Sequence, residues 1–429
     1  MSSNGNEIFS LLKNLFPINR SITGDGVRET LRMINDLVPL DIHEIPSGTE
    51  VFDWTIPDEW NIKDAYVEDS DGKRVIDFKS SNLHVVGYSI PFEGKITLEE
   101  LKDHLYFLPD QPDLIPYVTS YYEKRWGFCL PYNEYLKLKD GNYYVKIDST
   151  LKPGYLTYAD LVIDGESDKE ILISTYICHP SMSNNELSGP VVSTFLSKYL
   201  MGLPQRPFYT YRFVFCPETI GSITYLNQHL DHLKEKVIAG YVINCVGDPG
   251  PFSYLKTKSE NSLVDRITLH ALKHSNQKYN LYSYLDRRSD ERQYNSPGID
   301  LPIGSLMRTK HGSYPEYHTS GDNLNFVTPD ALNKSLRMYI RCIQMLENNR
   351  TYESLILCEP QLGRRGMYPS LSMKGSSDSS RLMKDIIAYS DGSNDLLWIA
   401  DKVNYPLWEL YPSIDKLVQG DNPVLKLVA

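Results

Sequence analysis

Apolar residues change their spacing along the chain, and each change predicts a different kind of structure. Residues 6–39 carry apolar side chains at helical spacing, which predicts two amphipathic helices. Residues 41–66 alternate apolar and polar positions, as half-buried strands do. Short strand signals separated by turn residues fill 67–150, and this pattern predicts a small β-rich module.

Between 159 and 347 the pattern becomes an alternation of strands and helices. Strands are expected at 158–163, 170–177, 212–216, 237–246 and 301–307, and helices at 189–200, 222–233, 263–274 and 329–346. Strands separated by helices predict a three-layer α/β fold with a mostly parallel sheet. Residues 350–429 predict three short helices and a terminal apolar run, which is typical of a small winged-helix domain.

These patterns divide the chain of 429 residues into three expected parts. Residues 1–66 and 151–349 form an α/β catalytic domain. A small β-rich domain is inserted at 67–150, and a winged-helix-like domain occupies 350–429. A chain of this length is too long for one small core, which agrees with several domains.

Composition narrows the classes of partner. The net charge of −11 and a pI near 5.5 argue against a protein held on nucleic acid by its phosphates. No apolar run is long enough to span a membrane, and the first residues lack the features of a secretory leader. None of the six cysteines forms a CxxC pair. We therefore expect a cytoplasmic protein without disulfides.

Candidate chemistry lies where the predicted strands end. In α/β sheets ligands bind beyond the carboxyl ends of the strands. His179, Glu218 and Asp248 each follow a predicted strand within a few residues, and His318 lies in a loop after the last one. Zinc accepts imidazole and carboxylate, and a catalytic zinc keeps one position for water. We predict a zinc site held by His179, His318, Glu186 and Asp248.

Three of these assignments leave an alternative. Glu218 has apolar neighbours and is expected to take a proton from zinc-bound water, although a helix N-terminus would also favour a glutamate there. Asp248 is either a ligand or a turn-forming aspartate before proline. Glu186 competes with Asn185 for the metal, and it could instead cap the helix that follows.

Other residues are expected around the ligands. In the charged stretch 287–292, Asp290 and Glu291 either form a solvated loop or line the cleft, where a carboxylate would bind the free amino group of a substrate. Arg308 and Tyr317 are expected to complete that wall.

A further pair is expected behind the ligands. Asn185 lies next to the predicted ligand Glu186. Asp322 follows His318 closely and is expected to fix its tautomer by a hydrogen bond.

The order of these residues resembles that of the M28-type zinc aminopeptidases. More closely, the phrases Ile177-Cys-His-Pro-Ser-Met182 and Tyr314-Pro-Glu-Tyr-His-Thr-Ser320 resemble the bacterial aminopeptidase-like proteins of the DUF4910 group. The resemblance covers essentially the whole chain. It implies an M28-like zinc peptidase domain, an inserted DUF2172 β domain and a C-terminal winged helix.

The resemblance also assigns roles to single residues. His179 matches the first ligand histidine of the M28 pattern, and His318 matches the last. Glu218 matches the general base. Either Asp248 or Asn244 stands near the aspartate ligand of the third strand.

The chain departs from the M28 pattern at other ligand positions. Ser181 stands where the pattern has an aspartate, Asn185 where the bridging aspartate falls, and Thr219 where the second glutamate falls. These departures imply a site with about one zinc ion per chain, or a site that has lost its metal, rather than a two-metal site.

The leading hypothesis is a zinc-dependent aminopeptidase or amidohydrolase that cleaves an amide next to a free amine. Its substrate would be a small peptide or an N-substituted small molecule. DUF4910-type genes are associated with surface-polysaccharide synthesis, so the resemblance also permits an N-acylated sugar. The alternative is a non-catalytic protein of peptidase fold that binds or regulates through its winged helix. An acyltransferase or cyclase is a third class without positive support. A homo-oligomer stays open.

Overall fold

The computed structural model describes residues 5–367, 376–420 and 422–428. The expected absence of a secretory leader rests partly on residues 1–4, which lie outside this range. The chain divides into two compact units, one made of Met1–Val264 and Lys278–Arg337, the other of Asp265–Gln277 and Met338–Ala429. Each unit is described by itself.

An eight-stranded sheet forms the centre of the first unit, with the order β1-β10-β12-β11-β13-β16-β14-β15. The strands are β1 (Asp41–Pro46), β10 (Tyr155–Ile163), β11 (Glu170–Tyr176), β12 (Thr210–Cys216), β13 (Val237–Val242), β14 (Phe252–Leu255), β15 (Tyr279–Tyr282) and β16 (Ile303–Met307). The four central strands β12, β11, β13 and β16 are parallel. Antiparallel pairing enters on both sides, through β10 and β14.

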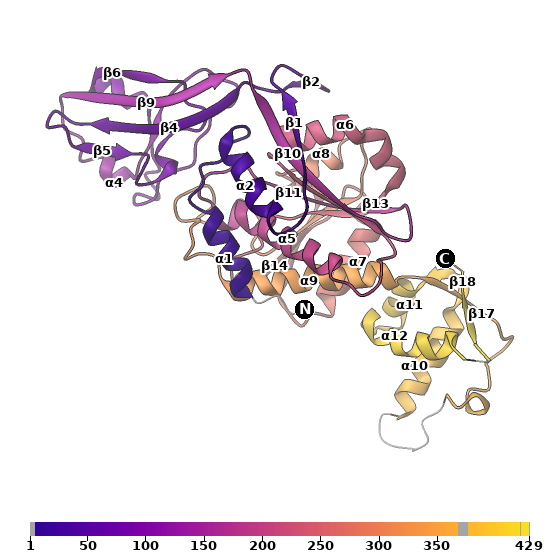
Figure 1. Cartoon of the computed structure of the whole chain (residues 1–429). Coiled ribbons are helices and arrows are strands. Elements are labelled where there is room, and N and C mark those ends of the chain that lie inside the picture. The colour runs from indigo at the N-terminus through magenta and orange to yellow at the C-terminus, as the bar shows by residue number, and fades with distance from the viewer. Residues whose placement is uncertain (1–4, 368–375, 421, 429) are drawn as a thin grey trace. The chain divides into compact units, whose positions relative to one another are not determined.

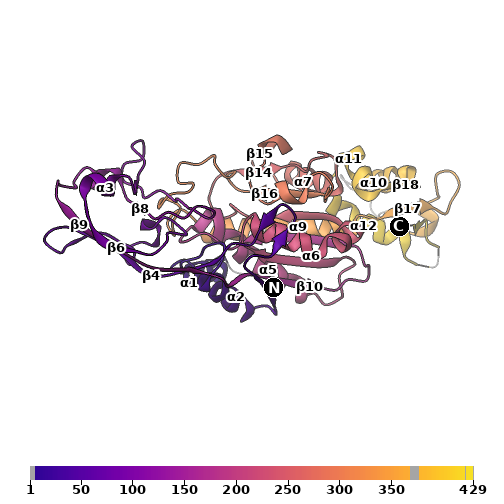
Figure 2. The same cartoon turned by 90° about the horizontal axis from the view of Figure 1, so that it is seen from above.

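Helices cover both faces of this sheet (Figures 1 and 2). On β11, Thr175 points to the face of α5 (Ser188–Met201), because a side chain at Gly189 of α5 would meet the Thr175 hydroxyl. Ser174 points the other way and accepts a hydrogen bond from Tyr294 of α8 (Glu291–Tyr294) at 2.9 Å. Every residue of β11 is buried, as expected of a strand with covered faces. The predicted three-layer α/β architecture is confirmed.

The remaining helices follow the predicted amphipathic pattern. α1 (Gly5–Leu15) buries the stripe Ile8, Leu11, Leu12 and Leu15 and contacts α5. α2 (Asp25–Asn35) contacts β10, and so does α6 (Ile220–Lys236). α9 (Pro329–Asn348) follows β16, which is the last strand of this sheet in chain order. The strands β14 and β15 were not predicted, because each has only four residues and neither is flanked by a long apolar run.

A separate four-stranded sheet lies at one end of the first unit (Figure 1). Its order is β5-β4-β9-β6, with β4 (Glu59–Glu68), β5 (Arg74–Asp77), β6 (Phe92–Thr97) and β9 (Asn142–Lys152). It has its own core, which includes Val67, Ile76, Val145 and Ile147. The predicted inserted module 67–150 covers most of this sheet, but β4 begins at Glu59 and β9 ends at Lys152.

Short elements complete the first unit. They are β2 (Glu50–Val51), β3 (Trp54–Thr55), β7 (Leu105–Tyr106), β8 (Phe128–Cys129), α3 (Leu98–Lys102) and α4 (Tyr132–Tyr135). β2 and β3 form a hairpin that carries Trp54.

The second unit contains the predicted three-helix domain. Its helices are α10 (Ser376–Tyr389), α11 (Leu396–Val403) and α12 (Leu407–Val418), and its sheet has the order β18-β17-β19 with β17 (Thr351–Ser354), β18 (Asp391–Asp395) and β19 (Leu425–Leu427). α7 (Leu263–Lys273) joins this unit through two contacts. Arg266 pairs with Asp395 at 2.7 Å, and His270 Nδ1 lies 2.6 Å from Asp401.

Within the described ranges, we find no helix that combines the length and the apolar character needed to cross a membrane.

The packing of α5 on the sheet gives a stability prediction. A Cβ at Gly189 would collide with the carbonyl oxygen of Ile243 and the hydroxyl of Thr175. We expect Gly189→Ala to destabilise the protein by about 1–3 kcal/mol, since an overpacked core must shift to accept the atom. Urea unfolding followed by tryptophan fluorescence measures the effect.

Gly94→Ala is the matched control, because a Cβ there would meet only the Phe92 ring at 3.5 Å. Its stability should stay within about 0.5 kcal/mol of the parent. Equal midpoints for the two variants would contradict the packing argument.

Candidate active site

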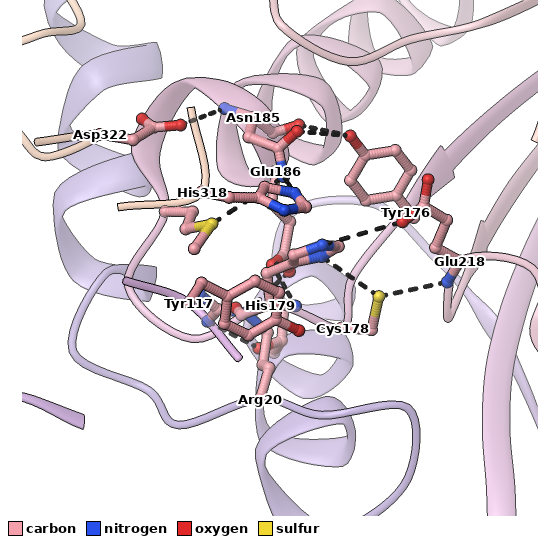
Figure 3. Close-up of polar contacts among 12 residues, drawn as sticks. Arg20, Tyr117, Tyr176, Cys178, His179, Asn185, Glu186, Glu218, His318 and Asp322 are labelled. Carbon is pink, nitrogen blue, oxygen red and sulfur yellow. Dashed lines mark hydrogen bonds and ion pairs between the residues drawn. The ribbon is translucent and has the colours of Figure 1, made fainter. Parts of the chain in front are cut away.

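Four loops meet beyond the carboxyl ends of the parallel strands (Figure 3). His179 follows β11, Glu218 follows β12, Cys245 follows β13, and His318 lies in the loop after β16. Thr219, Cys245 and His318 all have positive φ values of 50–65°, a conformation that costs energy for residues other than glycine. Such backbone strain often accompanies functional sites.

His179 and His318 form the centre of the site. Their ring centroids are 5.4 Å apart, and both side chains are largely buried. Burial lowers the pKa of His179 well below its usual value and lowers that of His318 to about 4, and in each case a nearby histidine adds to the effect. Both imidazoles are therefore neutral at physiological pH, as metal ligands must be.

Glu218 faces His179, as predicted for a base at this position. Its Oε2 lies 3.8 Å from His179 Nε2, and its Oε1 accepts a hydrogen bond from Ser289 Oγ at 2.8 Å. Burial, followed by the charge of Asp290, raises the pKa of Glu218. A carboxyl with a raised pKa can both take up and return a proton near neutral pH.

Glu186, predicted as a metal ligand, lies beside His179, with its Oε2 3.6 Å from His179 Nδ1, and is bonded to other groups. It accepts a hydrogen bond from the backbone N–H of His179 and another from Arg20 Nε at 2.9 Å. Arg20 also donates to the carbonyl oxygen of His179 at 3.0 Å. The pair thus fixes the backbone of His179 from behind. Sequence reasoning missed Arg20, because it lies in the N-terminal segment and 166 positions from its partner.

Asp322 holds a turn rather than a histidine. Its carboxylate accepts from the backbone N–H groups of Asn184 and Asn185 at 2.6 and 2.8 Å. These bonds fix the helical turn Ser183–Leu187 that precedes α5. His318 is held by other contacts: Tyr317 stacks on its ring at 3.9 Å, and Asn185 Nδ2 lies 3.4 Å from its Nε2.

Asp248 is the turn-forming aspartate of the two predicted alternatives. Its carboxylate accepts from Thr309 Oγ1 at 2.6 Å, from Gly250 N at 2.8 Å and from Asn184 Nδ2 at 3.0 Å. Arg308, predicted at the substrate, packs over the Phe252 ring at 4.4 Å and donates to the carbonyl of Asp248. Neither side chain lines the cavity described below.

Cys245 follows the third strand, β13, and contacts Asn185 and Tyr314. Its Sγ lies 3.9 Å from Asn185 Oδ1 and 3.7 Å from Tyr314 Oη. Burial raises the pKa of its thiol well above the usual value. Cys245 is fully buried, as a core residue is.

Asp290 and Glu291 are buried, and neither lines the cavity described next. Asp290 Oδ1 accepts from Thr219 N at 2.7 Å and from Ser222 Oγ at 2.9 Å, at the start of α6. Glu291 Oε1 accepts from the backbone N–H groups of Arg288 and Ser289. One oxygen of each carboxylate thus holds a loop, and the amine-binding role stays a prediction.

A cavity of about 350 Å³ opens above His179 and Glu218. Part of its wall is aromatic, with Tyr117, Tyr121 and Tyr122 from the segment between β7 and β8 and Trp54 from the β2–β3 hairpin. The segment is bonded to the His318 loop, since Tyr117 N donates to the His318 carbonyl at 2.8 Å. The only sequence signal for this wall was the density of aromatic residues there.

The donor atoms fit one metal ion better than two. In the described residues, the one close group of histidine, cysteine and carboxylate ligands comprises Cys178, His179 and Glu218, and the His318 ring lies beside it. A second ion would need further carboxylates. The positions at which the M28 pattern has further carboxylates hold Ser181, Asn185 and Thr219, whose side chains supply none.

Residues 9–349 match the model of the family described as "Domain of unknown function (DUF4910)". The chain belongs to this family. Residues 350–422 match a winged helix-turn-helix model.

Relatives agree with the family assignment. The chain is 48% identical, over all its length and 98% of the relative, to a Clostridium acetobutylicum protein named as a candidate polysaccharide biosynthesis protein with an aminopeptidase-like domain. It is also similar to the crystal structure of a candidate peptidase from Clostridium acetobutylicum, with 47% identity, a TM-score of 0.93 and coverage of 99% of this chain and 96% of that one.

More distant structures share only the fold. A zinc aminopeptidase from Bacillus subtilis superposes with a TM-score of 0.57 at 11% identity, covering 80% of this chain and 95% of that one. A peptidase M28 precursor from Shewanella amazonensis gives 0.57 at 15% identity, with 84% and 95% coverage. The DUF4910 chain therefore has the fold of zinc aminopeptidases, as its sequence predicted.

The buried pair behind His179 gives a second prediction. Arg20 and Glu186 are both inaccessible to solvent, so Arg20→Met should leave a buried carboxyl without its cation and cost about 3–5 kcal/mol of stability. Glu186→Gln added to Arg20→Met should restore part of the loss, because a neutral amide needs no cation. Thermal and urea unfolding of the single and double variants measures both effects.

Arg32→Met serves as control, since Arg32 lies exposed on α2. If Arg20→Met were as stable as Arg32→Met, the pair would not be a structural anchor.

Proposed function

We propose that this DUF4910 protein is a hydrolase that cleaves an amide bond with one bound metal ion, most simply zinc. The observation that carries the proposal is the position of Glu218, whose carboxylate lies 3.8 Å from His179 Nε2 at the floor of an open cavity. Metal-assisted hydrolysis needs at least ligands for the ion and a base for the attacking water. Two neutral imidazoles and Glu218 would supply these groups.

The side chains have separate tasks in this proposal. His179 and His318 would hold the ion, with the Asn185 amide beside them. Glu218 removes a proton from the attacking water and returns it to the leaving nitrogen, and its raised pKa suits both transfers. Ser289 keeps the carboxylate oriented by its hydrogen bond. A bound zinc ion would supply Lewis acidity and lower the pKa of water.

The substrate follows partly from the relatives and partly from the site. The aminopeptidase fold favours a peptide or another amide. The polysaccharide biosynthesis name of the Clostridium relative favours an N-acylated sugar or a similar N-substituted small molecule. A free amine next to the amide has less support, since Asp290 and Glu291 are buried. We also propose a cytoplasmic location, which the six free cysteines support.

A second candidate is a non-catalytic binding protein that acts through its winged helix. The departures from the M28 ligand pattern at Ser181, Asn185 and Thr219 favour it, and so does the winged-helix match. Metal content separates the two candidates.

We expect about one zinc ion per purified chain, because the site offers two imidazoles and one nearby carboxylate. His179→Ala and His318→Ala should each lose the ion, whereas His43→Ala, which changes a histidine outside the site, should keep it. Elemental analysis of the four proteins measures this. Two ions per chain, or none after zinc is supplied, would contradict the single-metal proposal.

Glu218→Gln tests the base separately. The variant should keep its fold, because Ser289 can still donate to the amide oxygen, but hydrolysis should fall by about 10²–10⁴-fold. Turnover of aminoacyl-anilide and N-acyl amino sugar panels gives the rate. Full activity in Glu218→Gln would remove Glu218 from the mechanism.

A further inference from the structure

The charge of the cavity differs from that expected of a site for a free amine. Among the described residues that line it, Glu218 is the single carboxylate, and the proposed reaction needs that group as a base. The lining also includes Arg292, a cation from α8. Arg292 would therefore repel the ammonium group of a substrate, and no further carboxylate lines the cavity to bind that group.

A second cavity of about 530 Å³ adjoins the first. The two share Trp54, Thr219 and Arg292, so they are parts of one continuous surface. The formally charged residues that line the outer cavity are Lys258, Arg287 and Arg292, and all are cations. This concentration of positive charge is not expected from a chain whose net charge is −11.

The two arginines of the outer cavity are positioned by neutral groups. Arg292 Nη2 donates to Thr219 Oγ1 at 2.7 Å, and Arg287 lies over the Tyr284 ring at 4.6 Å while it donates to the Tyr284 carbonyl. Neither forms an ion pair with any carboxylate of the described residues. Lys258 differs, since it pairs with Asp300 at 2.6 Å. The two guanidinium groups are thus held in place by neutral partners, and Glu218 and Asp290 are the nearby carboxylates on which the charge of Arg292 acts.

The contact of Arg292 places this charge close to the chemistry. Thr219, its hydrogen-bond partner, is the residue directly after Glu218. Trp54 and Tyr122 stand at the mouth, 37% and 56% exposed, with ring centroids 5.7 Å apart. Exposed aromatic rings offer flat apolar surfaces on which a sugar or another ring can pack.

We propose that the outer cavity binds an anionic group, a phosphate or a carboxylate, of the same substrate whose amide faces Glu218. The substrate class is then an acidic N-acyl compound, with its ring against Trp54 and Tyr122 and its anion on Arg287 and Arg292. Guanidinium groups bind both kinds of anion through paired N–H donors. The inference rests on the proposed amide hydrolysis for the position of the amide, but the anion subsite can be tested without turnover.

The test is calorimetric binding of three matched probes: N-acetylglucosamine, its 1-phosphate and N-acetylmuramic acid, which carries a carboxylate. At least one anionic probe should bind about tenfold or more tightly than the neutral sugar. Raising the salt concentration to about 0.15 M should reduce this preference, because the charges of Arg287 and Arg292 are exposed and salt screens them. Whether phosphate or carboxylate binds more tightly identifies the anion.

Variants assign the effect to the cavity. Arg292→Ala and Arg287→Ala should each lose most of the preference, and Arg292→Lys should keep part of it. Arg206→Ala is the matched control, because Arg206 is also exposed and bonded to a carbonyl, that of Asp164, but lies outside both cavities. It should bind like the parent protein.

Three results would overturn the subsite. The first is equal binding of the neutral and the anionic probes, and the second is an anion preference that survives in Arg292→Ala. The third is that neither these probes nor inorganic pyrophosphate binds at all. Anion-selective binding without any hydrolysis would leave the subsite intact and count against the proposed function. Hydrolysis without charge selectivity would do the reverse.

Discussion

The buried ion pair between Arg20 and Glu186 is the interaction on which the site geometry depends. Both side chains are fully enclosed, and removing two charges from water costs several kcal/mol each. Good geometry offsets this cost: Glu186 also accepts from the His179 backbone, and Arg20 also donates to it. The N-terminal segment is thereby attached to the end of β11. The position of His179 is a property of two distant parts of the chain.

Features that depend on local sequence were predicted, and features that depend on contacts between distant parts of the chain were not. The strands β10–β13 and β16 and the helices α5, α6, α7 and α9 follow from local apolar periodicity, and all were predicted close to their observed bounds. His179, His318 and Glu218 were expected together because parallel strands end at one edge of a sheet. Local rules suffice for these features.

Carboxylates were harder to assign than histidines. Glu186, Asp248, Asp290 and Asp322 all lie near the strand ends, as the sequence indicated, but each is bonded to backbone or side-chain donors elsewhere in the fold. A buried carboxylate must find such donors, and their positions depend on tertiary packing.

The contacts of the segment before Tyr121 have a consequence for how this family can change. Tyr117 donates to the His318 carbonyl, and Ser320 bonds to Ile115 in both directions. His318 is therefore carried on a loop that forms a short β-bridge with residues 67–150. Such an insertion is not an exchangeable module. Recombination that replaced it with a foreign domain would have to preserve this seam, so the inserted region and the histidine loop should evolve as one unit.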